Sequence, residues 1–177
     1  MSRYFDPVAS RRLIMTLALL AAVSYAPVPA YAGVDAGKTA YEAGDYEKAQ
    51  QEFSAPANSG DAEVHYWMGR LLDEGYLGKK DARGALGWFR KSGAQGHAEA
   101  QRIVGAYYEL GKAVSHSYRN AARWYEQAAD VGNTKAMRNL GTLYLDGKGV
   151  GTNQKKAMAL FEKSAALGNA KAMRNLG

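Results

Sequence analysis

The sequence predicts an all-α solenoid built from paired helices, and two observations lead to this fold class. First, a period of 36 residues runs through the chain without an insertion or deletion. Glycines, aromatic residues and alanines recur at this step: Gly60, Gly96, Gly132 and Gly168; Gly69, Gly105, Gly141 and Gly177; Phe53, Phe89, Tyr125 and Phe161; Ala49, Ala85, Ala121 and Ala157. Second, the apolar residues within one period follow helical spacing. Such periods are typical of solenoids, in which each unit packs on its neighbours and the molecule offers an extended surface.

The segment 1–32 precedes the repeats and resembles a cleavable signal peptide. Three arginines come before a short apolar run, and small residues stand where signal peptidase reads: Arg3, Arg11 and Arg12; Leu13 to Val23; Ala30 and Ala32. We expect cleavage after Ala32, with Sec-type export to the periplasm or the medium. Since a bilayer span needs about 20 apolar residues, the run is short for a membrane anchor, which is the alternative. Ser10-Arg11-Arg12 leaves twin-arginine export open.

Composition narrows the classes of partner. The chain has no cysteine, so an exported form cannot depend on disulfides and must be stabilised by packing. Its formal net charge of +6 falls to +4 when 1–32 is removed, because three arginines and one aspartate are lost. The remaining excess is spread along the repeats and forms no concentrated basic stripe. This distribution argues against nucleic-acid binding.

The unit 97–132 illustrates how one period folds. Ala100, Val104 and Tyr108 lie on one face of a first helix. Gly105 interrupts that face at a cost of about 1 kcal/mol relative to Ala, so we expect another helix to cross closely there. Ser117 then begins a second helix, which runs from Tyr118 to Asp130 and packs antiparallel to the first.

The residues that begin and end the helices also recur in each unit. The residue before each second helix can cap it through a side-chain oxygen: Asp45, Asp81, Ser117 and Asn153. Gly132 suits the left-handed conformation that ends a helix, and Asp61, Asn133 and Asn169 are expected to cap the first helices. The first unit differs, because Gly44-Asp45 turns tightly and Pro56 should end or kink its second helix.

These motifs resemble the Sel1-like repeat, a relative of the tetratricopeptide repeat. The fourth unit carries them most fully, with Ala136-Met137-Arg138-Asn139-Leu140-Gly141, Gly147-Lys148-Gly149-Val150 and Gly168-Asn169-Ala170. The resemblance implies a right-handed α/α solenoid. We divide it into a tetratricopeptide-like capping repeat at 33–60, Sel1-like repeats at 61–96, 97–132 and 133–168, and a truncated first helix at 169–177. There, Ala172, Met173 and Leu176 would be poorly covered, so we expect a truncated copy of a longer protein or self-association.

The candidate binding residues lie along the first helices. Tyr66, Arg102, Arg138 and Arg174 share one repeat position, and Trp67, Asn139 and Arg70 lie beside them. These positions vary between units while the packing positions do not. We expect them to line a concave surface that holds an unidentified protein or peptide, with the arginines facing acidic groups. Alternatively, the arginines are solvated or pair with glutamates of the next unit.

The sequence contains no strong motif for phosphate binding, metal binding or catalysis. The stretch Asp146 to Thr152 is glycine-rich but lacks the order of a phosphate loop, and His65, His97 and His116 do not have metal-ligand spacing. No arrangement for nucleophilic catalysis emerges, so we expect no enzyme activity, cofactor or metal.

The resemblance favours an exported adaptor in envelope signalling or complex assembly. A scaffold associated with the cell wall or exopolysaccharide is the alternative, since tyrosines and tryptophans can stack on sugars. A hydrolase is less favoured, because the cysteine-rich relatives linked to β-lactam hydrolysis have cysteines that this chain lacks.

Overall fold

A computed structural model describes residues 30–54 and 60–175, and these residues form helices and turns without strands. The helices are α2 (Ala30–Glu42), α3 (Tyr46–Ser54), α4 (Ala62–Glu74), α5 (Ala82–Ala94), α6 (Ala98–Leu110), α7 (Tyr118–Asp130), α8 (Thr134–Asp146), α9 (Gln154–Ala166) and α10 (Ala170–Met173). The prediction of an all-α, right-handed solenoid is confirmed. Most of the predicted signal, and Pro56, lie outside the described residues.

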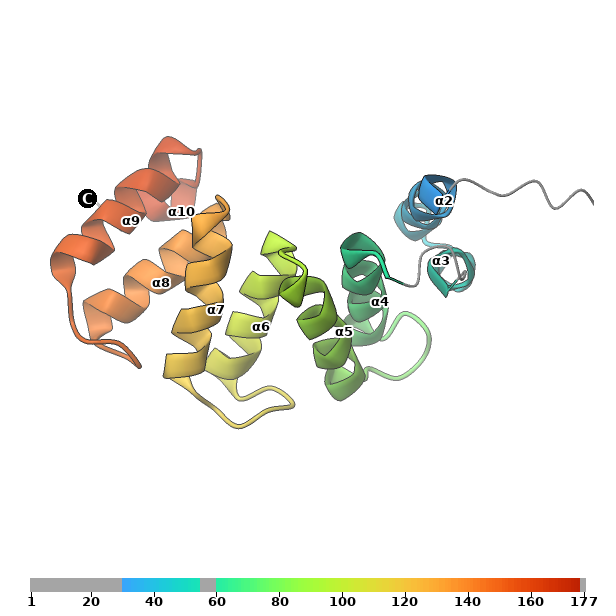
Figure 1. Cartoon of the computed structure of the whole chain (residues 1–177), viewed down its shortest axis with the longest axis horizontal. Helices are drawn as coiled ribbons and strands as arrows, with labels where there is room; N and C mark the ends of the chain where they lie inside the picture. The colour runs from blue at the N-terminus through green and yellow to red at the C-terminus, as the bar shows by residue number, and fades with distance from the viewer. Residues whose placement is uncertain (1–29, 55–59, 176–177) are drawn as a thin grey trace, which may run out of the picture.

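Consecutive helices form antiparallel pairs, and the pairs follow one another along a curved row. Figure 1 shows this row running from α2 and α3 at one end to α9 and α10 at the other. Each helix packs most extensively on the other helix of its own repeat, α4 on α5, α6 on α7 and α8 on α9. Contacts between repeats come next, through α5 on α6 and α7 on α8. The core therefore extends along the row as connected clusters.

The repeated glycine of each first helix lies against the repeated aromatic ring of the second. A Cβ atom built on Gly105 would lie 2.6 Å from the ring of Tyr125, and one on Gly69 would lie 2.7 Å from Phe89. Real Cβ atoms do not approach carbon this closely. The predicted close crossing is confirmed, and the ring occupies the space that a side chain would need.

The shortened first unit keeps the same contact. Gly37 of α2 faces Phe53 of α3, with a hypothetical Cβ 2.4 Å from the ring. Only residues 43–45 separate α2 from α3, whereas residues 75–81 separate α4 from α5. The tight turn was predicted, but Gly37 was not, because the shorter turn takes it out of the 36-residue register.

The predicted capping residues accept hydrogen bonds from the first turns of their helices. Asp81, Ser117 and Asn153 accept from the amides of Gly84, Asn120 and Lys156, and Asp45 accepts from Lys48. Asp61, Asn133 and Asn169 cap α4, α8 and α10 in the same way. His97 caps α6, where its Nδ1 accepts from the amide of Ala100 at 3.1 Å. That imidazole cap was not predicted.

The caps of the first helices also join neighbouring repeats. The Nε2 of His97 lies 3.2 Å from a carboxylate oxygen of Glu63, one repeat earlier. The amide of Asn133 donates to Glu99 at 2.9 Å in the equivalent position of the next pair. Each of these side chains therefore caps the start of one helix and contacts the adjacent unit, which links neighbouring repeats along the row.

The loop of the third unit contains a strained residue. Ala113 has φ +58°, in the left-handed region that disfavours residues with a Cβ. One repeat later the position is Gly149, with φ +71°. Although the sequence of this loop differs from that of the next unit, Ala113 adopts the same left-handed backbone conformation as Gly149.

The last described helix is partly covered. Ala172 of α10 is fully buried, whereas Met173 is exposed. The expected exposure is therefore wrong for Ala172, because α9 packs on this helix. Leu176 lies outside the described residues.

Candidate binding surface along the first helices

A hollow of about 260 Å³ lies between the first helices α4 and α6, and we call it the inner hollow. It is lined by Arg70, Asp73, Glu74, Glu99, Arg102, Ile103, Ala106, Tyr107, Leu110 and Lys112. Two repeats thus supply its opposite walls. Two of the predicted binding residues, Arg70 and Arg102, lie in it.

Charged groups around the inner hollow are paired with one another. Arg102 contacts Glu99 at 2.9 Å and Arg70 contacts Glu74 at 3.8 Å, in both instances within one helix. Burial would raise the pKa of Glu99, but hydrogen bonds from Arg102 and Asn133 outweigh it and hold the pKa below its ordinary value. The arginines are therefore neither fully solvated nor paired with the next unit.

One wall is fixed by contacts that cross between repeats. The hydroxyl of Tyr107 donates to Asp73 at 2.5 Å, and Lys112 forms an ion pair with the same carboxylate. Burial and the carboxylate of Asp73 raise the pKa of Tyr107, so its phenol remains a hydrogen-bond donor. These bonds hold α4 and α6 at a set separation.

Leu110 supplies an apolar contact at the edge of the inner hollow. Its side chain is 74 % exposed, the highest value among the exposed large hydrophobic residues of the described chain. The neighbouring repeats carry Glu74 and Asp146 at the same position. At this exposure Leu110 contributes little to packing within its own chain. Sequence comparison between units could have identified Leu110, but not Asp73 or Lys112, whose counterparts one repeat later are the similar residues Glu109 and Lys148.

Tyr66 and Trp67 stabilise the fold and do not line the inner hollow. Tyr66 is 8 % exposed and stacks on the ring of His97, with centroids 4.5 Å apart. Trp67 donates from its indole nitrogen to Glu63 at 2.9 Å and stacks near Phe53 of the first unit. The structure therefore places both aromatic residues in contacts between units.

The remaining predicted residues lie further along the chain. Arg138 donates to Asn139 at 2.7 Å and lines a second hollow, of about 360 Å³, beside the turn that leads into α10. Arg174 is exposed after α10 and lines neither hollow. The Nε atoms of Arg102 and Arg138 have no hydrogen-bond partner in the described part of the chain. Of the four residues at this repeat position, Arg102 and Arg138 thus line two different hollows, and Tyr66 and Arg174 line neither.

Residues 30–54 and 60–175 contain no group of three or more His, Asp or Glu side chains placed to hold a metal ion. His65 is buried beside Trp88 with its Nδ1 3.0 Å from Gln95. No helix within these ranges has the length and apolarity to cross a bilayer.

Comparison with known proteins identifies the family. The sequence model of the Sel1 repeat matches residues 62–97, 98–133 and 134–169, each one residue later than the predicted bounds. The chain therefore belongs to the Sel1 repeat family. Proteins of this family are generally scaffolds for protein interaction. No curated protein matches the chain at a significant level.

The solved structures that resemble the chain include the following three. A Sel1 repeat protein from Oxalobacter formigenes is 31% identical, with a TM-score of 0.77 over 79% of this chain and 58% of that one. A protective antigen of uropathogenic Escherichia coli is 30% identical, with a TM-score of 0.67 over 71% of this chain and 27% of that one. Cysteine-rich protein B of Helicobacter pylori, 23% identical with a TM-score of 0.55 over 70% and 98%, shares the fold. The chain spans little more than half of the first structure and about a quarter of the second.

Proposed function

We propose that this protein is an exported adaptor that binds a partner protein at the inner hollow. The observation that carries the proposal is Leu110, an exposed leucine beside Arg70 and Arg102 at a position where neighbouring repeats have acids. Arginine is enriched among the residues that dominate binding between proteins, and an exposed leucine beside it offers apolar surface whose burial by a partner is favourable. We further propose that the protein acts in envelope signalling or in the assembly of a protein complex.

The pairing of charges indicates what kind of partner fits. Three basic and three acidic side chains line the inner hollow, so its charges balance. A strongly acidic ligand is therefore attracted less strongly to this hollow than it would be to a row of arginines without acidic partners. We infer a partner that inserts an apolar side chain beside Leu110 and Ile103 and hydrogen-bonds to Arg102. Such polar contacts at the rim contribute to specificity and on-rate more than to affinity.

The proposal is tested by capture from envelope extract with matched variants. Leu110→Glu introduces the residue of the preceding repeat, so the fold should be retained while the apolar contact is lost. Arg102→Glu should also lose the captured partner. Val131→Gln is the control, because Val131 is 61 % exposed, lies in the turn between α7 and α8, and has Gln95 as its counterpart one repeat earlier. Capture that is equal for all variants contradicts the proposal.

Export and the alternative scaffold role need their own measurements. N-terminal sequencing of the protein recovered from the periplasm or medium should begin at Gly33, and retention of the whole chain in the cytosol contradicts export. Sedimentation with peptidoglycan or polysaccharide separates a sugar-binding scaffold from the adaptor. Tyr46 and Tyr76 stack on each other at 3.9 Å, so their facing surfaces are occupied. We expect no sedimentation.

A further inference from the structure

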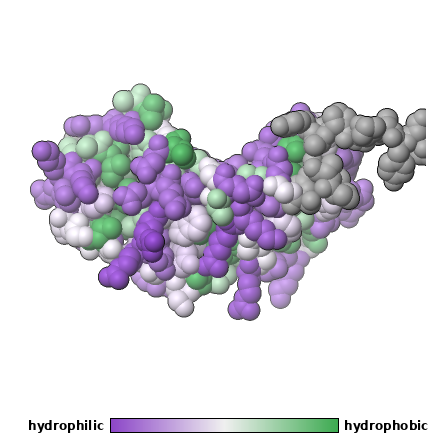
Figure 2. Space-filling model, in the orientation of Figure 1, coloured by the Kyte–Doolittle hydropathy of each residue, from purple (hydrophilic) through white to green (hydrophobic). Residues whose placement is uncertain are grey.

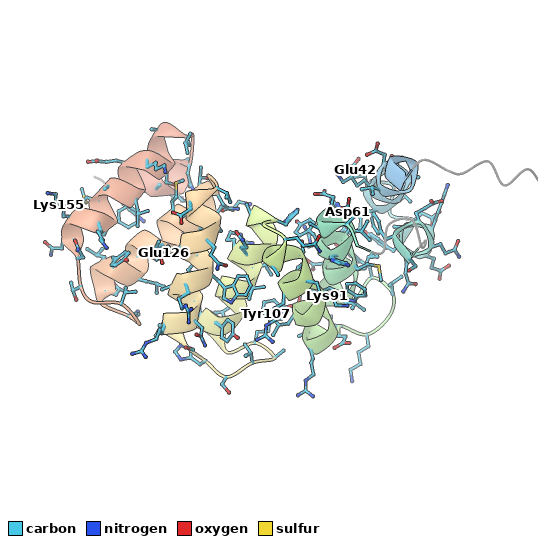
Figure 3. All side chains as sticks on the ribbon, viewed as in Figure 1. Glu42, Asp61, Lys91, Tyr107, Glu126 and Lys155 are labelled. Atoms are coloured by element: carbon cyan, nitrogen blue, oxygen red, sulfur yellow. The ribbon has the colours of Figure 1, made fainter. Side chains whose placement is uncertain are left out.

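A third hollow, of about 290 Å³, lies between the second helices α7 and α9 above α8, and we call it the outer groove. Met137 and Leu140 form its apolar floor, while Ala129 and Leu160 belong to its walls. Glu126 lies on the side of α7 toward α8 and α9 (Figure 3). Figure 2 shows hydrophobic patches over α8 and α9 among hydrophilic side chains. The outer groove shares no lining residue with the inner hollow.

Comparison with the preceding repeat explains why this space is open. Leu160 stands where the earlier units have Trp88 and Trp124. In the equivalent groove between α5 and α7, the ring of Trp124 lies against α5, where a Cβ built on Gly93 would be 3.1 Å from its Cζ3 atom. The counterpart of Gly93 is Ala129. The outer groove is thus a place that a tryptophan ring occupies elsewhere in the same fold.

The rim of the outer groove carries opposite charges on its two sides. Glu126 and Asp130 come from α7, and Lys156 and Lys163 come from α9. None of these four forms an ion pair with another described residue, although Lys156 lies over the ring of Tyr144 at 5.2 Å. The rim is therefore complementary to a ligand with separated positive and negative groups.

We propose that the outer groove binds a segment of a partner protein that inserts a tryptophan side chain between α7 and α9. A basic residue of that segment faces Glu126 and Asp130, and an acidic residue faces Lys156 and Lys163. The ring replaces the intramolecular tryptophan of the earlier repeats and covers Leu160. This site is separate from the inner hollow, so either can fail its test without affecting the other.

The test uses short peptides and amide NMR shifts of the intact protein. N-acetyl-Lys-Trp-Glu-amide should bind with a Kd on the order of 1 mM and shift the amides of Ala129 and Ala159. N-acetyl-Lys-Leu-Glu-amide should bind roughly tenfold more weakly, because tryptophan dominates such contacts. Equal binding of the two peptides, or shifts only at the inner hollow, overturns the proposal.

Two variants sharpen the result. Leu160→Trp with Ala129→Gly reproduces the preceding groove and fills the space from within, so the tryptophan peptide should no longer shift these amides. Unchanged binding by this variant, if it folds, overturns the proposal. Lys156→Glu with Lys163→Glu changes only exposed side chains, and should weaken the charged peptide roughly tenfold. N-acetyl-tryptophanamide should bind this charge variant as it binds the wild type, and an unaltered affinity for the charged peptide refutes the assigned rim.

Discussion

Two glycine substitutions on neighbouring helices should change stability in opposite directions. Gly87 of α5 and Gly105 of α6 both lie inside helices, so alanine at either site gains about 1 kcal/mol in helix propensity. A Cβ on Gly87 would meet no atom within 4 Å. Gly87→Ala should therefore raise the free energy of unfolding by about 1 kcal/mol.

Gly105→Ala adds the same propensity but forces a Cβ against a ring that cannot move freely. The nearest atoms, Cδ1 and Cε1 of Tyr125, would lie 2.6 Å away, and Tyr125 is fully buried. Overpacking of a core costs about 1–3 kcal/mol, and this approach belongs at the upper end. After the propensity gain, we expect a net loss of about 2 kcal/mol.

Thermal and urea unfolding of both variants measure whether their stabilities change in opposite directions. For a chain of this size, about 1 kcal/mol shifts the Tm by 2–4 °C, so the two variants should differ by roughly 6–12 °C. Tyr125→Leu combined with Gly105→Ala should lose less than the sum of the single changes, because the smaller side chain relieves the contact. If Gly105→Ala stabilises the protein as much as Gly87→Ala, the assigned close crossing is wrong.

Three further predictions concern single contacts. Ala113→Gly should raise the free energy of unfolding by about 0.5–1 kcal/mol in urea titration, because relief of the left-handed strain exceeds the added entropy of the unfolded chain; a loss of stability contradicts this. Glu109→Leu should cost about 1–3 kcal/mol, because the hydroxyl of Tyr125 donates to Glu109 at 2.5 Å and would lose its acceptor. Glu109→Leu with Tyr125→Phe, the pair found one repeat later, should recover most of that loss, and no recovery refutes the pairing. Since the folded-state pKa of Glu99 is lowered, its stabilising effect is present above the ordinary value of 4.5 and lost as the pH falls through the folded pKa. Urea titrations between pH 3 and pH 7 should show a smaller acid loss for Glu99→Gln than for wild type, and identical profiles argue against this role.

The regular part of the fold could be predicted because each repeat uses the same local solutions. The glycine and the aromatic ring 20 residues later keep their spacing in three units, and capping side chains recur at each second helix. The tight turn at Gly44 and Asp45 could also be predicted from local sequence. Gly37 was missed because the shorter turn leaves it 16 residues before Phe53 and out of register.

The candidate surfaces could be predicted only in part. The sequence placed Arg70 and Arg102 on the first helices, but their pairing with Glu74 and Glu99 depends on side-chain rotamers. His97 was missed as a cap because an imidazole caps a helix only when its ring turns back on the first turn. Leu110 did carry a signal, an apolar residue at an acidic repeat position, whereas the volumes of the hollows follow from packing in three dimensions.

The most direct measurement of the proposed adaptor role is photo-crosslinking in intact cells from a probe residue placed at position 110. We expect a discrete adduct with another protein from position 110, and none from position 131, which is also exposed. Arg102→Glu in the same chain should abolish the adduct. Adducts of equal yield from both positions, or none from position 110, would contradict binding at the inner hollow.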